Sequence, residues 1–580
     1  MIKRLAIAGF AVTVAACGGA RSGAHASTSS VRPVLLADGD LTADQQVTHA
    51  LHRLTFGARP GSVAQLHAAG LERWIAQQLQ PESIPDTLWE HFAGVFTTQS
   101  ASVKDLVDAN PPQDIWIKRL RKARGLPDTG RFVFSAEDSV DWKLVNDRTN
   151  RLSGEIVAAP VARSQLSERQ LLEVMTAFWE NHFSVFAGKM PTRFTVLEYD
   201  RDVIRPRALG KFRDLLGAVA HSPAMLYYLD NWQSASDTAH RTLPEWRAAE
   251  LATAAGKPVP RKGRRGNGLN ENFGRELMEL HTLGVAGGYS QRDVIEVARA
   301  LTGWTLQDPR EGGGFIFRPE WHDAEPKTVV GHPLAAGRGI EDGEEVLDLL
   351  ARHPSTARFI ATKLVRRFVS DTPPAGLVAR VASTFERTDG DIRAVVQAIV
   401  TSAEFFSHAA YKSKVKSPRE LVVSALRAIN AGGDSTPRTA GVIGRLGEPL
   451  FGHVTPDGYP DAADAWMNAG AVLDRINFGV NAGSGRIPGA SLDRWPPSWT
   501  LAFAPLSAQV DGVVALLLDG EASPDTRQIL MTGQNPLLAL RADTLGAGAM
   551  AAPVGTPPSS KLTFAALVGL ALGSPEFQRR

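Results

Sequence analysis

The sequence contains a single cysteine, Cys17, among its 580 residues. A disulfide bond needs two thiols, so a disulfide framework within the chain is excluded. The sequence also lacks an excess of charge of either sign, because it contains 63 Lys and Arg residues and 61 Asp and Glu residues. This balance provides no electrostatic footprint for nucleic acid, and no nucleic-acid partner is expected. Beyond the N-terminus, no segment approaches the roughly 18 consecutive apolar residues that a membrane-spanning helix needs.

Established catalytic and metal-binding motifs are missing as well. The sequence has no zinc-ligand spacing, no Walker loop, no Gly-x-Ser-x-Gly elbow and no His-Glu-x-x-His run. A motif therefore assigns neither a reaction nor a cofactor, and the identity of any cofactor is unknown at this point.

The N-terminus has the pattern of a bacterial export signal. Two basic residues precede an apolar run from Leu5 to Ala16, which is too short to span a membrane. We therefore expect residues 1–16 to be a signal peptide. The run ends in VAAC, which resembles a lipobox, and the thiol of Cys17 would then carry the diacylglycerol. The alternative is a plain cleaved signal peptide with an incidental cysteine.

Lipidation of Cys17 would make the chain an anchored protein of the cell envelope. Gly18 stands where lipoproteins retained in the inner membrane usually carry Asp, so the outer membrane is the expected location. Residues 17–40 are mostly small and polar, and we expect them to form a flexible tether. The membrane would then be contacted through acyl chains and not through a spanning helix.

Helical periodicity dominates the remainder of the chain. The sequence predicts a predominantly α, multi-helix globular body, and its length predicts two or three subdomains. Two β-prone runs, Phe315–Phe317 and Thr328–Val330, predict one small β-hairpin near residues 315–330. The expected parts are an N-terminal helical subdomain, a linker or insertion, a central helical subdomain and a C-terminal region of helices and loops, at residues 41–230, 231–269, 270–440 and 441–580.

The stretch NENFGRELMELHTLGV, residues 270–285, holds the first candidate site residue. On a helix, Glu276 falls inside an apolar arc formed by one Phe and three Leu side chains. A carboxylate on such an arc must be paired, protonated or metal-bound. Glu276 is therefore either a general base or metal ligand, or one half of a structural ion pair. His281 lies roughly 140° away around the helix, so one metal ion could not easily be held by both.

Two further segments supply candidates. In LLEVMTAFWENHFSVF, His182 shares an apolar face, so we expect it to be buried, either bonded to a carbonyl or acting as a ligand or acid/base group. Asn181 lies at the edge of that face and could orient a neighbour, whereas Glu180 is expected to point to solvent. In EWHDAEPKT, His322 and Asp323 lie in a loop, where Asp323 either takes part in chemistry or forms an Asx-turn.

These segments together define the predicted site. The catalytic candidates are His182, Glu276, His322 and Asp323, and the binding candidates are Asn181, Asn272, Arg275, His281 and Lys327. The sharpest hypothesis is a single pocket between helices that collects the four catalytic candidates around a metal ion or an acid/base reaction. The protein would then be a periplasmic metal-dependent hydrolase or oxidoreductase.

A family resemblance rests on six phrases that occur in order: HALHRLTFGARPG, FWENHFSV, GLNENFGRELMELHTLGVAGGYSQRDVIEVARALTGW, HDAEPKTVVG, KSPRELVVSALRA and PDGYPDAADAW. They resemble the signature blocks of the domain of unknown function 1800 family, a group of exported bacterial proteins. The resemblance covers about residues 45–580 and implies no particular activity. It does imply a companion, because similar proteins tend to occur beside a second exported protein with an alkaline-phosphatase-like fold.

Two classes of function remain after these observations. The favoured one is a lipid-anchored helical scaffold that binds another exported protein or a polymer, since catalytic motifs are missing and a tether follows Cys17. The alternative is the metal-dependent enzyme described above.

Replacement of Cys17 by Ser tests the anchor. The variant cannot be acylated at this position, so we expect it to move from the membrane fraction to the soluble fraction of the envelope, as measured by cell fractionation. A variant that stays in the membranes would show that the lipoprotein interpretation is wrong.

Overall fold

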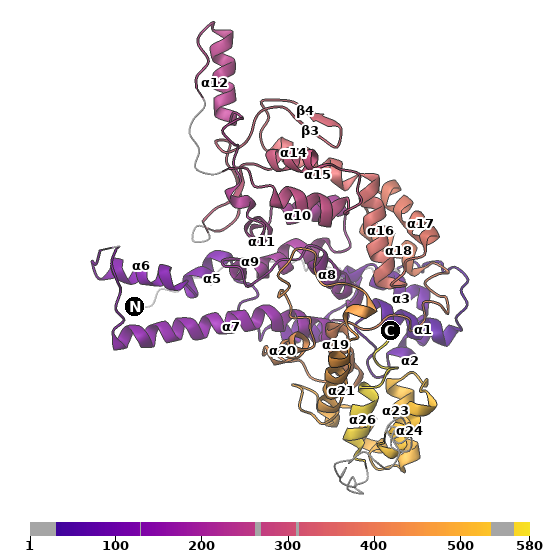
Figure 1. Cartoon of the computed structure of the whole chain (residues 1–580). Helices are drawn as coiled ribbons and strands as arrows, with labels where there is room; N and C mark the ends of the chain where they lie inside the picture. Colours follow the sequence, from indigo (N-terminus) through magenta and orange to yellow (C-terminus); the bar gives the residue numbers. More distant parts are fainter. Residues whose placement is uncertain (1–30, 128, 262–267, 309–311, 535–561) are drawn as a thin grey trace, which may run out of the picture.

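A computed structural model describes residues 31–127, 129–261, 268–308, 312–534 and 562–580. The predicted fold class is confirmed, because helices dominate and strands are few and short (Figure 1). The expected signal peptide, Cys17 and residues 18–30 lie outside the described residues. Within the described ranges, no helix combines the length and the apolar character needed to cross a bilayer.

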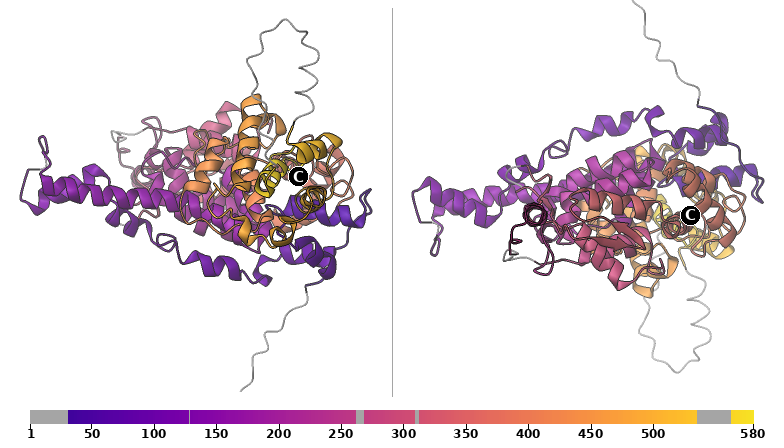
Figure 2. Two further views of the ribbon diagram at one scale, coloured as in Figure 1. Left: turned by 90° about the horizontal axis from the view of Figure 1, so that it is seen from below. Right: turned by 90° about the horizontal axis from the view of Figure 1, so that it is seen from above.

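The N-terminal part of the chain leads from short helices into a helix of 31 residues, α7. Its helices are α1 (Ala43–Leu54), α2 (Ser62–Ala69), α3 (Leu71–Gln78), the 3₁₀ turn η1 (Pro81–Ser83), α4 (Thr87–Ala93), α5 (Val103–Ala109), α6 (Gln113–Ala123) and α7 (Ala136–Leu166). Ser135 caps α7, since its side chain accepts a hydrogen bond from the amide of Asp138. Helix α6 and the first half of α7 form an arm that projects from the body in all views (Figures 1 and 2).

The middle of the chain contains two π-helical turns, η2 and η5. Its helical elements are α8 (Gln170–His182), α9 (Thr192–Glu198), η2 (Tyr199–Ile204), η3 (Arg205–Arg207), α10 (Phe212–Ala220), α11 (Pro223–Tyr228), η4 (Asn231–Gln233), α12 (Leu243–Ala254), α13 (Asn272–Glu276), η5 (Leu277–Thr282) and α14 (Gln291–Ala300). Helix α12 lies inside the segment that the sequence assigned to a linker, and it projects from the body (Figure 1). The π turns matter because such turns leave backbone carbonyls available to other partners.

The β structure differs from the predicted hairpin in its pairing. Both predicted runs form strands, but β2 (Phe315–Phe317) pairs with β1 (Trp304–Leu306), and β3 (Lys327–Val329) pairs with β4 (His332–Leu334). The second hairpin is closed by Val330 and Gly331, whose φ angles are both positive, at 49° and 79°. Positive φ at both central residues is typical of the tight turns that join antiparallel strands. Valine is rare at such a position, so this turn does not match the usual turn-forming residue pairs.

The C-terminal part is again helical. Its elements are α15 (Glu341–Ala351), α16 (Pro354–Phe368), α17 (Ala375–Arg387), α18 (Ile392–Val400), α19 (Pro418–Ala428), α20 (Arg438–Arg445), η7 (Ala463–Ala465), α21 (Ala469–Gly483), η8 (Leu492–Arg494), α22 (Ser498–Leu501), α23 (Leu506–Leu517), α24 (Pro524–Thr532) and α26 (Phe564–Leu572). Helices α16, α17 and α18 lie together on the right of the view in Figure 1, and α21, α23, α24 and α26 form a group at its lower end.

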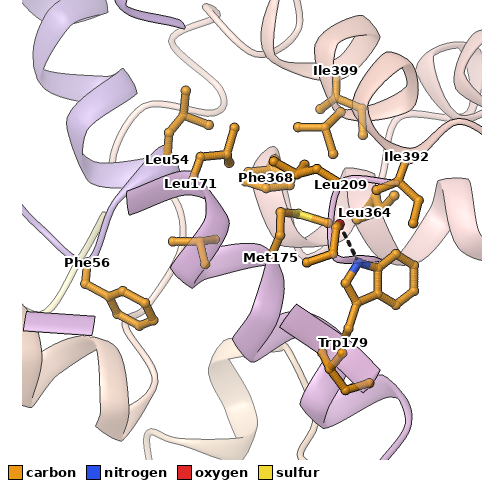
Figure 3. Packing of buried hydrophobic residues seen from close by; sticks show 14 of the residues in the cluster. Leu54, Phe56, Leu171, Met175, Trp179, Leu209, Leu364, Phe368, Ile392 and Ile399 are labelled. Atoms are coloured by element: carbon orange, nitrogen blue, oxygen red, sulfur yellow. Dashed lines mark hydrogen bonds between the residues drawn. The ribbon is translucent and has the colours of Figure 1, made fainter. Parts of the chain in front are cut away.

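A single large cluster of buried apolar side chains runs through the body, with members from Val34 to Phe577. All three of the expected helical regions contribute to it. Figure 3 shows its centre, where Trp179 and Met175 of α8 pack near Leu364 of α16. The indole nitrogen of Trp179 donates a hydrogen bond of 2.9 Å to the carbonyl of Ala208, so this large ring is buried without an unpaired polar atom. Helix α8 is thereby fixed in the middle of the molecule.

The last part of the expected tether lies against the body. Val34 is buried. The amide of Ala37 donates to the carbonyl of Thr401 at 2.9 Å, and the amide of Asp40 donates to the carbonyl of Phe406 at 3.1 Å. These backbone hydrogen bonds hold residues 31–40 in place, which differs from the flexible conformation that the composition suggested. Unlike the small polar stretch that precedes it in the sequence, this part of the segment contains apolar residues, of which Val34 is buried and Val31 and Leu36 pack against the core.

Helices α21 and α26 approach each other through glycines. A Cβ atom at Gly483 would lie 2.5 Å from the carbonyl oxygen of Ala565 and 2.5 Å from the amide of Gly569. Both neighbours are backbone atoms, so the helices would have to separate to accept a side chain.

Gly483→Ala should therefore lower the stability of the protein by about 1–3 kcal/mol, despite the better helix propensity of Ala. The melting temperature of the protein, measured by thermal unfolding, reports this loss. Gly470→Ala is the matched control, because Gly470 lies on the same helix and its Cβ would meet no atom closer than 3.5 Å. Equal melting temperatures for the two variants would contradict the close packing.

Candidate functional site

A cavity of about 370 Å³ lies between α8, α16, the start of α19 and the loop 453–466, and we call it the α16 cavity. Its lining combines aromatic and charged side chains, among them Phe56, Phe178, Asn181, His182, Lys363, Arg366, Arg367, Arg419, Glu420, Glu448, His453, Asp457, Tyr459, Asp461 and Trp466. Four of the six phrases that carry the family resemblance supply lining residues. Segments far apart in the sequence therefore meet at one concave surface.

Asn181 attaches the loop to the C-terminal end of α8. Its side-chain nitrogen donates to the carbonyl of Tyr459 at 2.8 Å, and its side-chain oxygen accepts from the amide of Tyr459 at 2.7 Å. Gly458 permits this approach, because a Cβ there would lie 2.1 Å from the carbonyl oxygen of Asn181. The backbone of Gly458 also has φ +72°, a conformation that favours glycine. The side chain of Asn181 thus binds the loop backbone through one donor and one acceptor, as backbone groups do between neighbouring strands.

His182 and Lys363 form a pair at the wall of the cavity. His182 is buried, as its apolar face predicted, and its Nε2 lies 3.1 Å from the carbonyl oxygen of His281. A carbonyl only accepts, so Nε2 carries the proton and Nδ1 presents a lone pair. Lys363 Nζ lies 2.9 Å from this Nδ1. Burial, Lys363 and His281 hold the pKa of His182 well below its usual value, so the imidazole is neutral.

Lys363 differs from an ordinary lysine in its surroundings. It forms no ion pair within the described part of the chain, and its nearest hydrogen-bond partner is the neutral ring of His182. Burial, together with the charge of Arg366, lowers the pKa of Lys363 to about 8, although Asp461 and Asp457 act in the opposite direction. A measurable fraction of its amine is therefore neutral near pH 7.

Adjacent arginines on α16 have different roles. Arg367 pairs with Glu420 of α19, which also accepts from Arg580 Nε at 3.0 Å. Burial raises the pKa of Glu420, but Arg367 and Arg580 outweigh it and bring the pKa to about 2. Arg366 also lines the cavity, yet it has no hydrogen bond or ion pair with any described residue. Its guanidinium is therefore available to a ligand.

Glu180 is buried, and the expectation that it points to solvent is wrong. Its carboxyl lies 3.3 Å from Arg419 and also interacts with Asp200, which in turn binds Arg163 at 3.0 Å. Burial and the charge of Asp200 raise the pKa of Glu180 to about 8. Glu180 is therefore mostly protonated near pH 7, whereas Arg205 and Arg163 hold the pKa of Asp200 below its usual value. Helix α8 is therefore buried on the face that carries Glu180 as well as on its apolar face, and the spacing of apolar residues predicts only the latter.

Glu276 lies outside the lining of the α16 cavity and is half-buried. The expected ion pair with another helix is not formed among the described residues. Burial raises the pKa of Glu276, as do the charges of Glu279 and Asp457, although Arg275 acts in the opposite direction. Two binding candidates of the same segment are at the surface. Asn272 donates weakly to the carbonyl of Leu229 at 3.4 Å, and Arg275 pairs with Glu271 at 3.3 Å.

His281 is fully buried, and both of its ring nitrogens lack a hydrogen-bond partner among the described residues. Burial and Lys363 lower its pKa to about 3. Its contribution to the site comes from its backbone carbonyl, which lies in the π turn η5 and orients the ring of His182. The side chain itself packs against Phe183, with ring centroids 5.1 Å apart.

His322, Asp323 and Lys327 form a separate buried cluster. Lys327 Nζ lies 2.7 Å from Asp342, His322 Nε2 lies 3.4 Å from the same carboxylate, and Asp323 binds Arg299 at 2.8 Å. Asp323 also accepts from the amide of Glu325 at 2.9 Å, which is the Asx-turn geometry considered as an alternative. None of these residues lines the α16 cavity. The cluster joins the β3–β4 hairpin to α14 and α15.

The structure thus brings His182 and Asn181 to one cavity, and it places His322 and Asp323 elsewhere. Sequence reasoning missed Lys363 and Arg366, because basic residues on an amphipathic helix are usually solvated. Among the described residues, no group of three or more His, Cys, Asp or Glu side chains is arranged to hold a metal ion.

The protein is predominantly helical, and a cavity lined by polar and aromatic side chains lies between its helices. The chain matches the family described as "Protein of unknown function (DUF1800)" over residues 49–579, and it belongs to this family. No curated protein and no solved structure matches the chain.

Asn181→Ala tests the attachment of the loop. The variant loses both hydrogen bonds to Tyr459, so we expect the Tyr459 amide to exchange with solvent about 10-fold faster, in line with the net contribution of a hydrogen bond. Hydrogen exchange followed by mass spectrometry measures this rate. Asn181→Asp keeps the acceptor for that amide and should show a smaller effect. Unchanged exchange in both variants would show that the loop is held by other contacts.

Proposed function

We propose that this protein is an envelope binding protein whose α16 cavity takes an acidic group of a small molecule or of a polymer end. The observation that carries the proposal is Arg366, a guanidinium in the cavity without a partner among the described residues. A guanidinium presents donors in a planar fork that matches a carboxylate or phosphate, so an anionic group would satisfy it.

The remainder of the lining suits a small organic acid. Arg367 is paired with the ionised Glu420, and the guanidinium of Arg419 is held by hydrogen bonds to Ser164 and Glu180, so neither arginine is as available to a ligand as Arg366. Tyr459 and Trp466 provide apolar ring surface, with ring centroids 6.1 Å apart. A volume of about 370 Å³ is within the usual range for small-molecule sites.

We also propose that the protein is held at the outer membrane through Cys17 and acts beside a companion exported protein. The family resemblance implies a companion with an alkaline-phosphatase-like fold. The projecting arm of α6 and α7 supports a protein contact, because Val133, Val140 and Leu144 are 77%, 61% and 54% exposed there. Large apolar side chains gathered on a projecting element are typical of an interaction site.

Arg366→Gln tests the cavity. We expect the wild-type protein to bind small carboxylates or phosphate, and the variant to bind them about 10- to 100-fold more weakly, the usual loss for a hydrogen bond to a charged group. Isothermal titration with succinate, glucuronate and phosphate measures the affinities.

Arg358→Gln is the matched control, because Arg358 lies on the same helix and is exposed outside the cavity. This variant should bind as the wild type does. Equal losses in both variants, or no binding of any of the three anions to the wild type, would contradict the proposal.

A further inference from the structure

We propose that Lys363 forms an imine with a small aldehyde or ketone that carries an acid group, so that the α16 cavity holds its ligand covalently and reversibly. This inference rests on the proposed function, because Arg366 supplies the acid-binding half of the site. Lys363 and Arg366 are three residues apart on α16, both line the cavity, and residues at this spacing share one face of a helix.

The hydrogen bond to His182 directs the amine. Because Nε2 of His182 donates to a backbone carbonyl, the Nδ1 lone pair can only accept, and it lies 2.9 Å from Nζ of Lys363. The contact therefore fixes Nζ at the cavity wall without giving it a counter-charge. His182 is a positioning residue in this arrangement.

The charged and titratable groups around Lys363 keep part of the amine neutral. Both neighbouring histidines, His182 and His281, are buried and uncharged, and burial together with Arg366 disfavours the ammonium form. Asp457 and Asp461 favour the ammonium form, but they do not restore an ordinary lysine pKa. A desolvated lysine beside a second cation is a known way to prepare an amine for attack on a carbonyl.

The reaction balances without an oxidant or a metal ion. The lone pair of neutral Nζ forms a bond to the carbonyl carbon, and the π electrons move to the oxygen, which takes up a proton as nitrogen loses one. The carbinolamine then breaks its C–O bond and forms C=N. The oxygen leaves as water, which carries both hydrogens that Nζ has lost. Hydrolysis reverses each step, so the ligand can be released.

The experiment uses wild-type protein, glyoxylate as the acidic aldehyde and cyanoborohydride as the trapping agent at pH 7. Reduction of the imine leaves a stable carboxymethyl group on nitrogen, which peptide mass mapping locates. Lys363 should be modified on the order of a hundredfold faster than exposed Lys143, because a pKa near 8 leaves far more neutral amine than an ordinary lysine has.

Glycolaldehyde, which has no acid group, separates this inference from the proposed function. Arg366→Gln removes a charge that disfavours the ammonium form of Lys363, so it should slow modification by both aldehydes, but modification by glyoxylate at least 10-fold more than modification by glycolaldehyde. Fast modification by both aldehydes in the wild type, slowed equally by Arg366→Gln, would retain the reactive amine and overturn the acid-binding role. Modification of Lys363 no faster than that of Lys143 by either aldehyde would overturn the imine.

Discussion

The carboxylate of Glu420 is the contact on which the arrangement of the site depends. It accepts a hydrogen bond of 2.9 Å from the amide of Ser417 at the start of α19, and it binds Arg367 of α16 and Arg580 near the C-terminus. Three separate parts of the chain are therefore joined at one buried anion. Removal of a charge from water is costly unless several partners replace the solvent, and Glu420 has those partners.

This buried ion pair also explains why the cavity has a free cation beside a paired one. Arg367 turns to Glu420, so its positive charge is neutralised inside the body. The neighbouring Arg366 has no such carboxylate within the described residues and lines the cavity. Asn181 then closes the opposite wall through its two hydrogen bonds to Tyr459. The helical core positions both walls, and a loop completes the site, as is common for binding sites on rigid scaffolds.

The sequence predicted those features that depend on local periodicity. The α class and the burial of His182 follow from apolar side chains repeated at helical spacing, and both are found. The strand pairing was not predicted because pairing is a contact between residues that the sequence pattern does not connect. The turn of the second hairpin was not recognised because valine is rare at a positive φ, which Val330 adopts. The prediction that Glu180 points to solvent was wrong because α8 is buried on more than one face. The buried carboxyl group of Glu180 interacts there with Arg419 and Asp200.

The candidate site was harder to predict than the fold for the same reason. Sequence spacing shows that Lys363 and Arg366 share a face of α16, but it does not show which helix or loop covers that face. The hydrogen bond between His182 and Lys363 joins residues 181 positions apart. Such a pair becomes visible only when α8 and α16 are seen side by side. Glu276 was a candidate because of its position on an apolar arc, yet it does not line the cavity.

If Cys17 is acylated as proposed, the attachment of residues 31–40 to the body limits the distance between the protein and the membrane. The segment that could act as a leash runs only from Cys17 to Val31, a separation of 14 residues. Fully extended, 14 residues reach about 50 Å at most. An acylated Cys17 would thus confine the cavity to a shallow layer above the lipid surface. The protein would then encounter ligands and companion proteins only within that layer, and it would encounter companions anchored in the same membrane most often.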